Sequence, residues 1–176
     1  ETPISNRGEY EITKTIELRM KERDFDAFIP GEKWVDIGSP WDLLCAHEIY
    51  MGSIEGVKEG VIEKNVRING EVVLKKGALI KSGTYMEGNI ILDEGAVIGP
   101  NSYIRGSTYI GKGSKIGAAS EVKNSIILED SKIPHHNYVG DSIIGRGCNL
   151  GSGTKVANLR LDGGQIPVTL KGKKIN

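Results

Sequence analysis

The sequence has little of what marks several large classes of protein. Its two cysteines, Cys45 and Cys148, are too few and too far apart for a disulfide framework or a CxxC metal site. It contains no apolar run long enough to cross a bilayer and no basic segment followed by an apolar one, so nothing in it predicts a membrane span or a secretory signal. We therefore expect a cytoplasmic protein that does not bind a membrane.

Aromatic residues and net charge are also scarce. Aromatics make up 6% of the chain and the formal net charge is zero, which argues against a nucleic-acid platform. The charge is nevertheless uneven, because residues 1–50 contain 11 acidic and 6 basic residues, whereas residues 51–176 contain 12 acidic and 17 basic ones. This dispersed positive excess fits a small anionic ligand or simply a solvated basic surface.

A strict six-residue repeat dominates the centre of the chain. An apolar residue recurs at every sixth position, namely at Ile62, Ile68, Leu74, Ile80, Met86, Leu92, Ile98, Ile104, Ile110, Ile116, Val122 and Leu128. A small residue often follows four positions later, as at Ala78, Thr84, Ala96, Ser102, Thr108, Ser114 and Ser120. This period predicts a hexapeptide β-helix, in which three hexads form one triangular coil with the large side chain inside and the small one at the corner.

The repeat is interrupted once, in the stretch SKIPHHNYVGD. The pattern resumes at Tyr138, Ile144, Leu150 and Val156, and the interval from Leu128 to Tyr138 is ten residues, four more than a hexad. We therefore predict an outward loop that carries His135 and His136, since neighbouring coils fix the register on both sides. A surface histidine, with an ordinary pKa of about 6.5, can act as a general base or be merely solvated.

Two cations are aligned by the same period. Arg105 and Lys123 are separated by three hexads, which is one full coil, and each directly follows a core aliphatic residue. They should stack on one edge, where two cations suit a phosphate. The alternative is charge for solubility alone, as at Lys75 and Lys81. A three-histidine zinc site is not available, because the third histidine, His47, lies in the N-terminal part.

The flanking segments differ from the repeat. Residues 1–52 predict a helix through Ile12, Ile16 and Met20, then a strand, a turn at Gly38-Ser39-Pro40 and a second helix. Residues 53–158 form the predicted β-helix. Residues 159–176 predict a hairpin around Asp162-Gly163-Gly164 and a basic tail, which together cap the open coil.

The segment SKIPHHNYVGD, followed by GRGCNLGSGTKVANLR, resembles the acetyltransferase half of the bifunctional sugar-1-phosphate nucleotidylyltransferase/acetyltransferases, most closely the archaeal ones. This is the family of the bacterial glucosamine-1-phosphate acetyltransferase/N-acetylglucosamine-1-phosphate uridylyltransferase. The resemblance implies a mainly β fold, a left-handed parallel β-helix of hexapeptide repeats preceded by a small α+β remnant of a nucleotidyltransferase domain. It also implies acetyl-CoA as co-substrate, an amino-sugar phosphate as acceptor, UDP-sugar biosynthesis as the setting and a homotrimer as the assembly.

The resemblance assigns roles to individual residues. It makes His135 the catalytic base, whereas His136 falls on a variable position of the motif. The substrate-binding residues that it implies are Arg105 and Lys123 for the sugar phosphate, Tyr138 and Asn149 for the sugar, and Asn158 near the reacting amine. It places the backbone amide of Ser152 at the acetyl thioester.

The resemblance extends to the N-terminal part and has limits there. GEYEIT and WVDIGSPWDLL resemble the closing segments of a nucleotidyltransferase domain, in which Asp36 would bind the catalytic Mg²⁺. The Gly-rich nucleotide loop is absent, so we expect no nucleotide transfer by these residues. Gly164 and Pro167 stand where relatives usually carry basic residues, which affects the sugar site.

The alternative function is a non-catalytic β-helix that trimerises or regulates a nucleotidylyltransferase.

Overall fold

The computed structural model describes residues 1–29, 31, 34–170 and 172–175, which form two compact units, Glu1–Trp34 and Val35–Asn176. The first unit contains helix α1 (Ile12–Arg19), where the four-residue spacing of Ile12 and Ile16 predicted a helix. None of the side chains of α1 is buried. This unit is therefore held by local hydrogen bonds and exposes its apolar residues.

The second unit begins with an extended segment and helix α2 (Pro40–Met51). Ser39 has extended backbone angles, its hydroxyl donates to the Asp42 carboxylate, and Pro40 occupies the first helical position. This start agrees with the predicted Ser-Pro helix signal. The strand predicted for residues 34–37 is wrong, because that segment pairs with no strand of the described chain.

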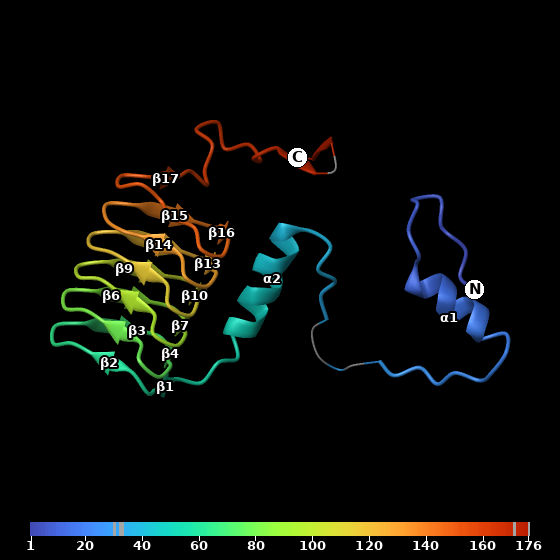
Figure 1. The fold of residues 1–176 in the computed structure, drawn as a ribbon, viewed down its shortest axis with the longest axis horizontal. Helices are drawn as coiled ribbons and strands as arrows, with labels where there is room; N and C mark the ends of the chain where they lie inside the picture. Colours follow the sequence, from blue (N-terminus) through green and yellow to red (C-terminus); the bar gives the residue numbers. More distant parts are fainter. Residues whose placement is uncertain (30, 32–33, 171, 176) are drawn as a thin grey trace. The chain divides into compact units, whose positions relative to one another are not determined.

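The rest of the second unit is a parallel β-solenoid of three sheets (Figure 1). Each coil contributes one strand to each sheet, except that the last described coil has none in sheet B, and every strand pairs with the strand one coil away. Sheet A contains β1 (Val57–Lys58), β4 (Val72–Leu74), β7 (Ile90–Leu92), β10 (Thr108–Ile110), β13 (Ile126–Ile127) and β16 (Ile143–Ile144). Sheet B contains β2 (Val61–Ile62), β5 (Leu79–Ile80), β8 (Val97–Ile98), β11 (Lys115–Ile116) and β14 (Lys132–Ile133). Sheet C contains β3 (Arg67–Asn69), β6 (Tyr85–Glu87), β9 (Tyr103–Arg105), β12 (Glu121–Lys123), β15 (Tyr138–Gly140) and β17 (Lys155–Val156).

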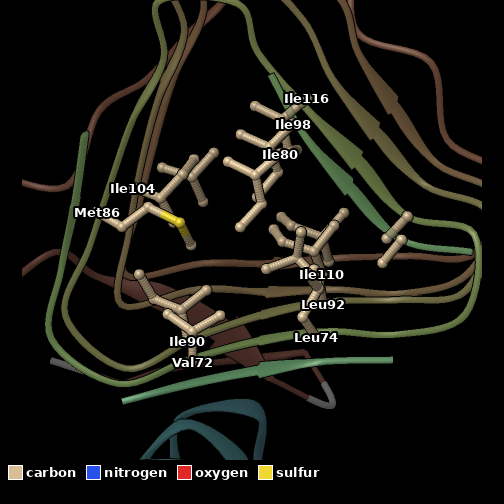
Figure 2. Close-up of a cluster of buried hydrophobic side chains, with 14 of the residues drawn as sticks. Val72, Leu74, Ile80, Met86, Ile90, Leu92, Ile98, Ile104, Ile110 and Ile116 are labelled. Atoms are coloured by element: carbon tan, nitrogen blue, oxygen red, sulfur yellow. The ribbon is translucent and has the colours of Figure 1, made fainter. Parts of the chain in front are cut away.

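The core fills the inside of the triangular coils. Figure 2 shows Met86 and Ile104 pointing inward from one side, Ile80, Ile98 and Ile116 from the second, and Leu74, Leu92 and Ile110 from the third. All eight are at most 1% exposed. The small residues that follow them are also buried, and the hydroxyls of the serines bond to the next coil, as when Ser114 Oγ donates to the Leu128 carbonyl at 2.8 Å. The hexad therefore gives each coil one large core residue and one small corner residue, as predicted.

Helix α2 covers the outer face of sheet A (Figures 1 and 2). The outward side chains of this sheet are apolar, and Ile91 and Ile126 are 7% and 6% exposed. Asn89 Nδ2 donates to the carbonyl of Met51 at 2.8 Å, which fixes the end of the helix to a corner of the solenoid. Sheet C carries mostly polar outward side chains instead, and α2 leaves its face open.

The predicted insertion at the histidines is wrong. The core positions are Ile127, Ile133 and Val139, which recur at every sixth position, whereas Leu128 and Tyr138 are only partly buried. The coils become one residue shorter instead, as Ile110 pairs with Ile127 and Val122 with Val139. The shortening lies in the corner between sheets C and A, where Asn124 and Ser125 replace the three residues 106–108.

We expect Ile127→Ala to lower the free energy of unfolding by about 2–5 kcal/mol, because it leaves a cavity in the core. Leu128→Ala should cost less than half as much, since this side chain is partly exposed. Urea denaturation of the two variants measures the difference. A larger loss for Leu128→Ala would show that the core register runs through Leu128 after all.

The C-terminal segment forms the antiparallel strands β18 (Val168–Leu170) and β19 (Lys173–Ile175). The predicted hairpin is therefore present, but its centre lies near Gly172 instead of residues 162–164. The Asp162-Gly163-Gly164 stretch forms a separate turn, in which Asp162 accepts from Arg160 and from the Gly164 amide. Lys171 and Asn176, part of the predicted basic tail, lie outside the described residues.

Candidate functional site

Sheet C brings the two predicted phosphate-binding cations together. Strands β9 and β12 are in register, so Arg105 pairs with Lys123, and Gly140 of β15 follows one coil further. Because side chains alternate along a strand, Ile104 and Val122 enter the core while their neighbours point outward. The predicted one-coil stacking of Arg105 and Lys123 is confirmed.

Arg105 is held by a carboxylate and an aromatic ring. Its Nε donates to Glu121 Oε1 at 2.7 Å, and its guanidinium carbon lies 5.5 Å from the centre of the Tyr103 ring. The hydrogen bond to Glu121 raises the pKa of the guanidinium above its ordinary value. Since Glu121 binds Nε, the two terminal nitrogens are oriented for bidentate contact with an oxyanion.

Lys123 belongs to a network that spans three coils. Its Nζ lies 3.2 Å from Asp141 Oδ2, and the same oxygen accepts from Asn158 Nδ2. The Tyr138 hydroxyl donates to Asn158 Oδ1 at 3.2 Å, above Gly140. Burial opposes ionisation of Asp141, but hydrogen bonds from Asn158 and Lys123 outweigh it and lower the pKa of the carboxyl.

A surface hollow of about 310 Å³ lies beside these cations. It is lined by Glu87, Gly88, Tyr103, Arg105, Gly106, Lys123 and Asn124. Two glycines of positive φ, Gly88 at 97° and Gly106 at 67°, form its corner, where the backbone conformation favours glycine. The hollow is wide enough for a phosphate and adjoining groups, and both of its cations come from the predicted site.

His135 occupies the corner between sheets B and C. This corner, residues 134–137, has the same length as residues 117–120 one coil earlier. The His135 side chain is exposed, and its carbonyl accepts from the Gly153 amide at 3.3 Å and lies 3.5 Å from Ser152 Oγ. The structure therefore stacks His135 and Ser152 in consecutive coils.

The predicted residues fall into two groups within one chain. Arg105, Lys123 and Asn158 lie where the strands of sheet C end, whereas His135 lies where they begin. Tyr138, at the start of β15, reaches the first group through its hydroxyl. Asn149 is exposed and bridges to Lys132 on sheet B.

Sequence reasoning missed the partners of the two cations. Glu121 and Asp141 each pair with a cation, and Tyr103 lies beneath Arg105. A signal was present, because opposite charges about one coil apart in the sequence predict a contact between adjacent coils once the register is known. Because Leu128 was wrongly predicted to be a core residue, the sequence did not predict which residue of the preceding coil lies beside Asp141.

The described residues do not form a metal site. No cluster of three or more histidine, cysteine, aspartate or glutamate side chains occurs within them. Asp36 is an exposed carboxylate in the extended segment before α2, so it does not by itself fit a bound Mg²⁺. His47 lies on α2 against the solenoid, where burial lowers the pKa of its imidazole.

Comparison with known proteins places the chain in a family. A family model described as the GMPPB C-terminal domain matches residues 86–175. The chain belongs to this family. Residues 86–175 include every predicted substrate-binding residue and His135, so the GMPPB C-terminal domain match covers both groups of the candidate site.

Curated relatives of this member of the GMPPB C-terminal domain family confirm the resemblance to archaeal bifunctional enzymes. "Bifunctional protein GlmU" of Methanococcus maripaludis strain C7 is 54% identical over 171 residues, which are 97% of this chain and 42% of that protein. A bifunctional sugar-1-phosphate nucleotidylyltransferase/acetyltransferase of Sulfurisphaera tokodaii is 44% identical over 98% of this chain and 43% of its own length. The chain thus spans about two fifths of these relatives.

A solved structure shows the same fold. A mutant of perosamine N-acetyltransferase from Caulobacter crescentus, in complex with CoA and GDP-perosamine, matches with a TM-score of 0.53 at 17% identity. The match covers 65% of this chain and 57% of the other.

Neither described helix of the present chain is long and apolar enough to cross a bilayer.

Proposed function

We propose that this chain transfers an acetyl group from acetyl-CoA to the amine of an amino-sugar 1-phosphate. The observation that carries this proposal is the aligned pair Arg105 and Lys123 beside the hollow, with an exposed histidine in the corner that leads into the same sheet. Paired cations suit a phosphate monoester, and the histidine suits removal of a proton from an amine.

The proposed reaction accounts for every bond and proton with the substrates and the residues of the candidate site. The neutral amine nitrogen attacks the thioester carbonyl, the C–S bond breaks, and the sulfur of CoA leaves with the proton that His135 has taken from the nitrogen. His135 accepts the proton that the amine loses, and a backbone amide near Ser152 stabilises the oxyanion that forms on the carbonyl. Tyr138, Asn149 and Asn158 position the sugar and its amine. The rigid solenoid contributes mainly by orientation.

We further propose that the active form is a homotrimer with sites shared between neighbouring prisms. Within one chain His135 and the cations lie at opposite ends of the sheet C strands, and Asn149 lies on another sheet. A neighbouring prism would complete each half-site. A monomeric mass in light scattering for a fully active chain would contradict this assembly.

Acetyl-CoA as the donor is supported by the names of the relatives and by the CoA in the perosamine N-acetyltransferase complex. Residues 1–52 are proposed to be the end of a nucleotidyltransferase domain, in which Asp36 would bind Mg²⁺. That activity would need the rest of such a domain, and a pyrophosphate assay with nucleoside triphosphate and sugar 1-phosphate tests it.

The first test is thiol release from acetyl-CoA by the chain in the presence of glucosamine 1-phosphate or galactosamine 1-phosphate. We expect release with one or both sugars and none with glucose 1-phosphate, which has no amine. Release that does not depend on the amine would indicate thioester hydrolysis. No release with any sugar would favour the alternative, a solenoid that only trimerises or regulates the nucleotidylyltransferase.

A further inference from the structure

Asp141 connects the two ends of the polar network on sheet C. It follows β15 directly, and its carboxylate accepts hydrogen bonds from the side chains of Lys123, Asn124 and Asn158. Lys123 and Asn124 lie one coil below and Asn158 one coil above. One carboxylate therefore joins a predicted phosphate contact to the residue predicted to lie near the reacting amine.

The network fixes the orientation of the Asn158 amide. A carboxylate can only accept hydrogen bonds, so the NH₂ end of Asn158 must face Asp141, and its carbonyl end accepts from Tyr138. The pair also covers Gly140, since a Cβ at that position would lie 2.5 Å from Tyr138 Oη and 2.6 Å from Asn158 Nδ2. Rotation of the amide would leave an NH₂ group facing the donor hydroxyl.

We propose that Asp141 is a positioning residue for acetyl transfer, which orients the Asn158 amide at the acceptor amine and holds Lys123 at the edge of the hollow. This inference rests on the proposed function, because both residues act in it. Asp141 does not bind the phosphate, since two anions repel each other. Its effect reaches the substrate through Asn158 and Lys123.

Two effects of Asp141 on the reaction have opposite signs and can be separated. A negative charge beside the phosphate site weakens the binding of an anionic sugar, so its removal favours binding. The loss of a fixed Asn158 amide slows the chemical step. We therefore expect Asp141→Asn to lower kcat roughly tenfold or more, because a hydrogen bond to a charged group is lost, while KM for glucosamine 1-phosphate changes little, because the loss of the ion pair with Lys123 opposes the loss of the negative charge.

The substitution suits the backbone at this corner. Asp141 has a φ of 49°, a left-handed conformation that asparagine adopts readily. A matched control is Asp130→Asn, because Asp130 is exposed, has a φ of 57°, and donates its backbone N–H to the Lys112 carbonyl at 2.8 Å as Asp141 does to Lys123 at 2.9 Å. The control should keep wild-type kcat and KM. Equal kcat in the two variants would overturn the positioning role.

A double-mutant cycle identifies the residue through which Asp141 acts. In an Asn158→Ala background, Asp141→Asn should cause little further loss of kcat, because the amide that it orients is gone. Losses that multiply independently would overturn the assignment to Asn158. A general loss of folding is excluded if the melting temperatures of Asp141→Asn and Asp130→Asn agree.

The network itself can be tested without turnover. Carbon-13 NMR titration of the Asp141 carboxyl should give a pKa below that of an ordinary aspartate, and Asn158→Ala should raise it. An unchanged pKa would overturn the network. A wild-type chain that releases no thiol would overturn the proposed function, and the titration would still decide whether Asp141 binds Asn158.

Discussion

We expect His135→Ala to lower kcat for the proposed acetyl transfer by about 10²–10⁴-fold, the usual contribution of a general base. The neutral amine nitrogen becomes acidic as it bonds to the thioester carbonyl, so the proposed reaction depends on a group that removes its proton as the new bond forms. His135 is exposed at the corner of sheets B and C, and its backbone is fixed by Gly153 of the next coil. We expect KM for both substrates to change much less than kcat.

The neighbouring histidine provides the matched control. His136 is also exposed, and its ring centre lies 5.9 Å from that of His135. It has a φ of 55°, and its backbone groups bond to Ala118 below and to Lys155 above. His136→Asn should therefore keep most of the activity, since asparagine adopts this backbone conformation. The measurement is thiol release with glucosamine 1-phosphate. The assignment of His135 as the base would be refuted if His135→Ala stayed active or if His136→Asn lost as much activity as His135→Ala.

The fold could be predicted because its period is short and its core residues are large. Each coil buries large side chains at equivalent positions, so one aliphatic residue at every sixth position specifies the solenoid up to Val122. Beyond Val122, the six-residue period alone does not predict which residues enter the core. Ile126, Ile127 and Leu128 are all apolar, and a corner that is one residue shorter moves the core from Leu128 to Ile127 without changing the composition.

The candidate site was predicted in part for the same reason. Arg105 and Lys123 lie before the short corner, so counting three full hexads brought them together correctly. Asp141 lies after it, and its contact with Lys123 depends on the shortened coil and on the length of the lysine side chain. Ion pairs between coils depend on register and on side-chain reach, which periodicity alone does not give.

We expect Arg105→Ala and Lys123→Ala to raise KM for the amino-sugar phosphate by roughly 10–100-fold each, because each would remove a proposed charge-assisted hydrogen bond to the phosphate. KM for acetyl-CoA should stay close to the wild-type value. Lys115→Ala is the control, since Lys115 is an exposed cation on sheet B, away from the hollow. Initial rates over both substrate concentrations separate the two KM values.

Arg105 allows a test of whether charge alone or the planar shape of the guanidinium binds the phosphate. Glu121 binds Arg105 through Nε, which leaves the planar fork of terminal nitrogens directed away from that ion pair. Arg105→Lys keeps the charge but removes the fork, so it should recover only part of the affinity lost in Arg105→Ala. Full recovery by lysine would show that charge alone binds the phosphate. An equal rise in KM for acetyl-CoA would instead assign these cations to the phosphates of the coenzyme.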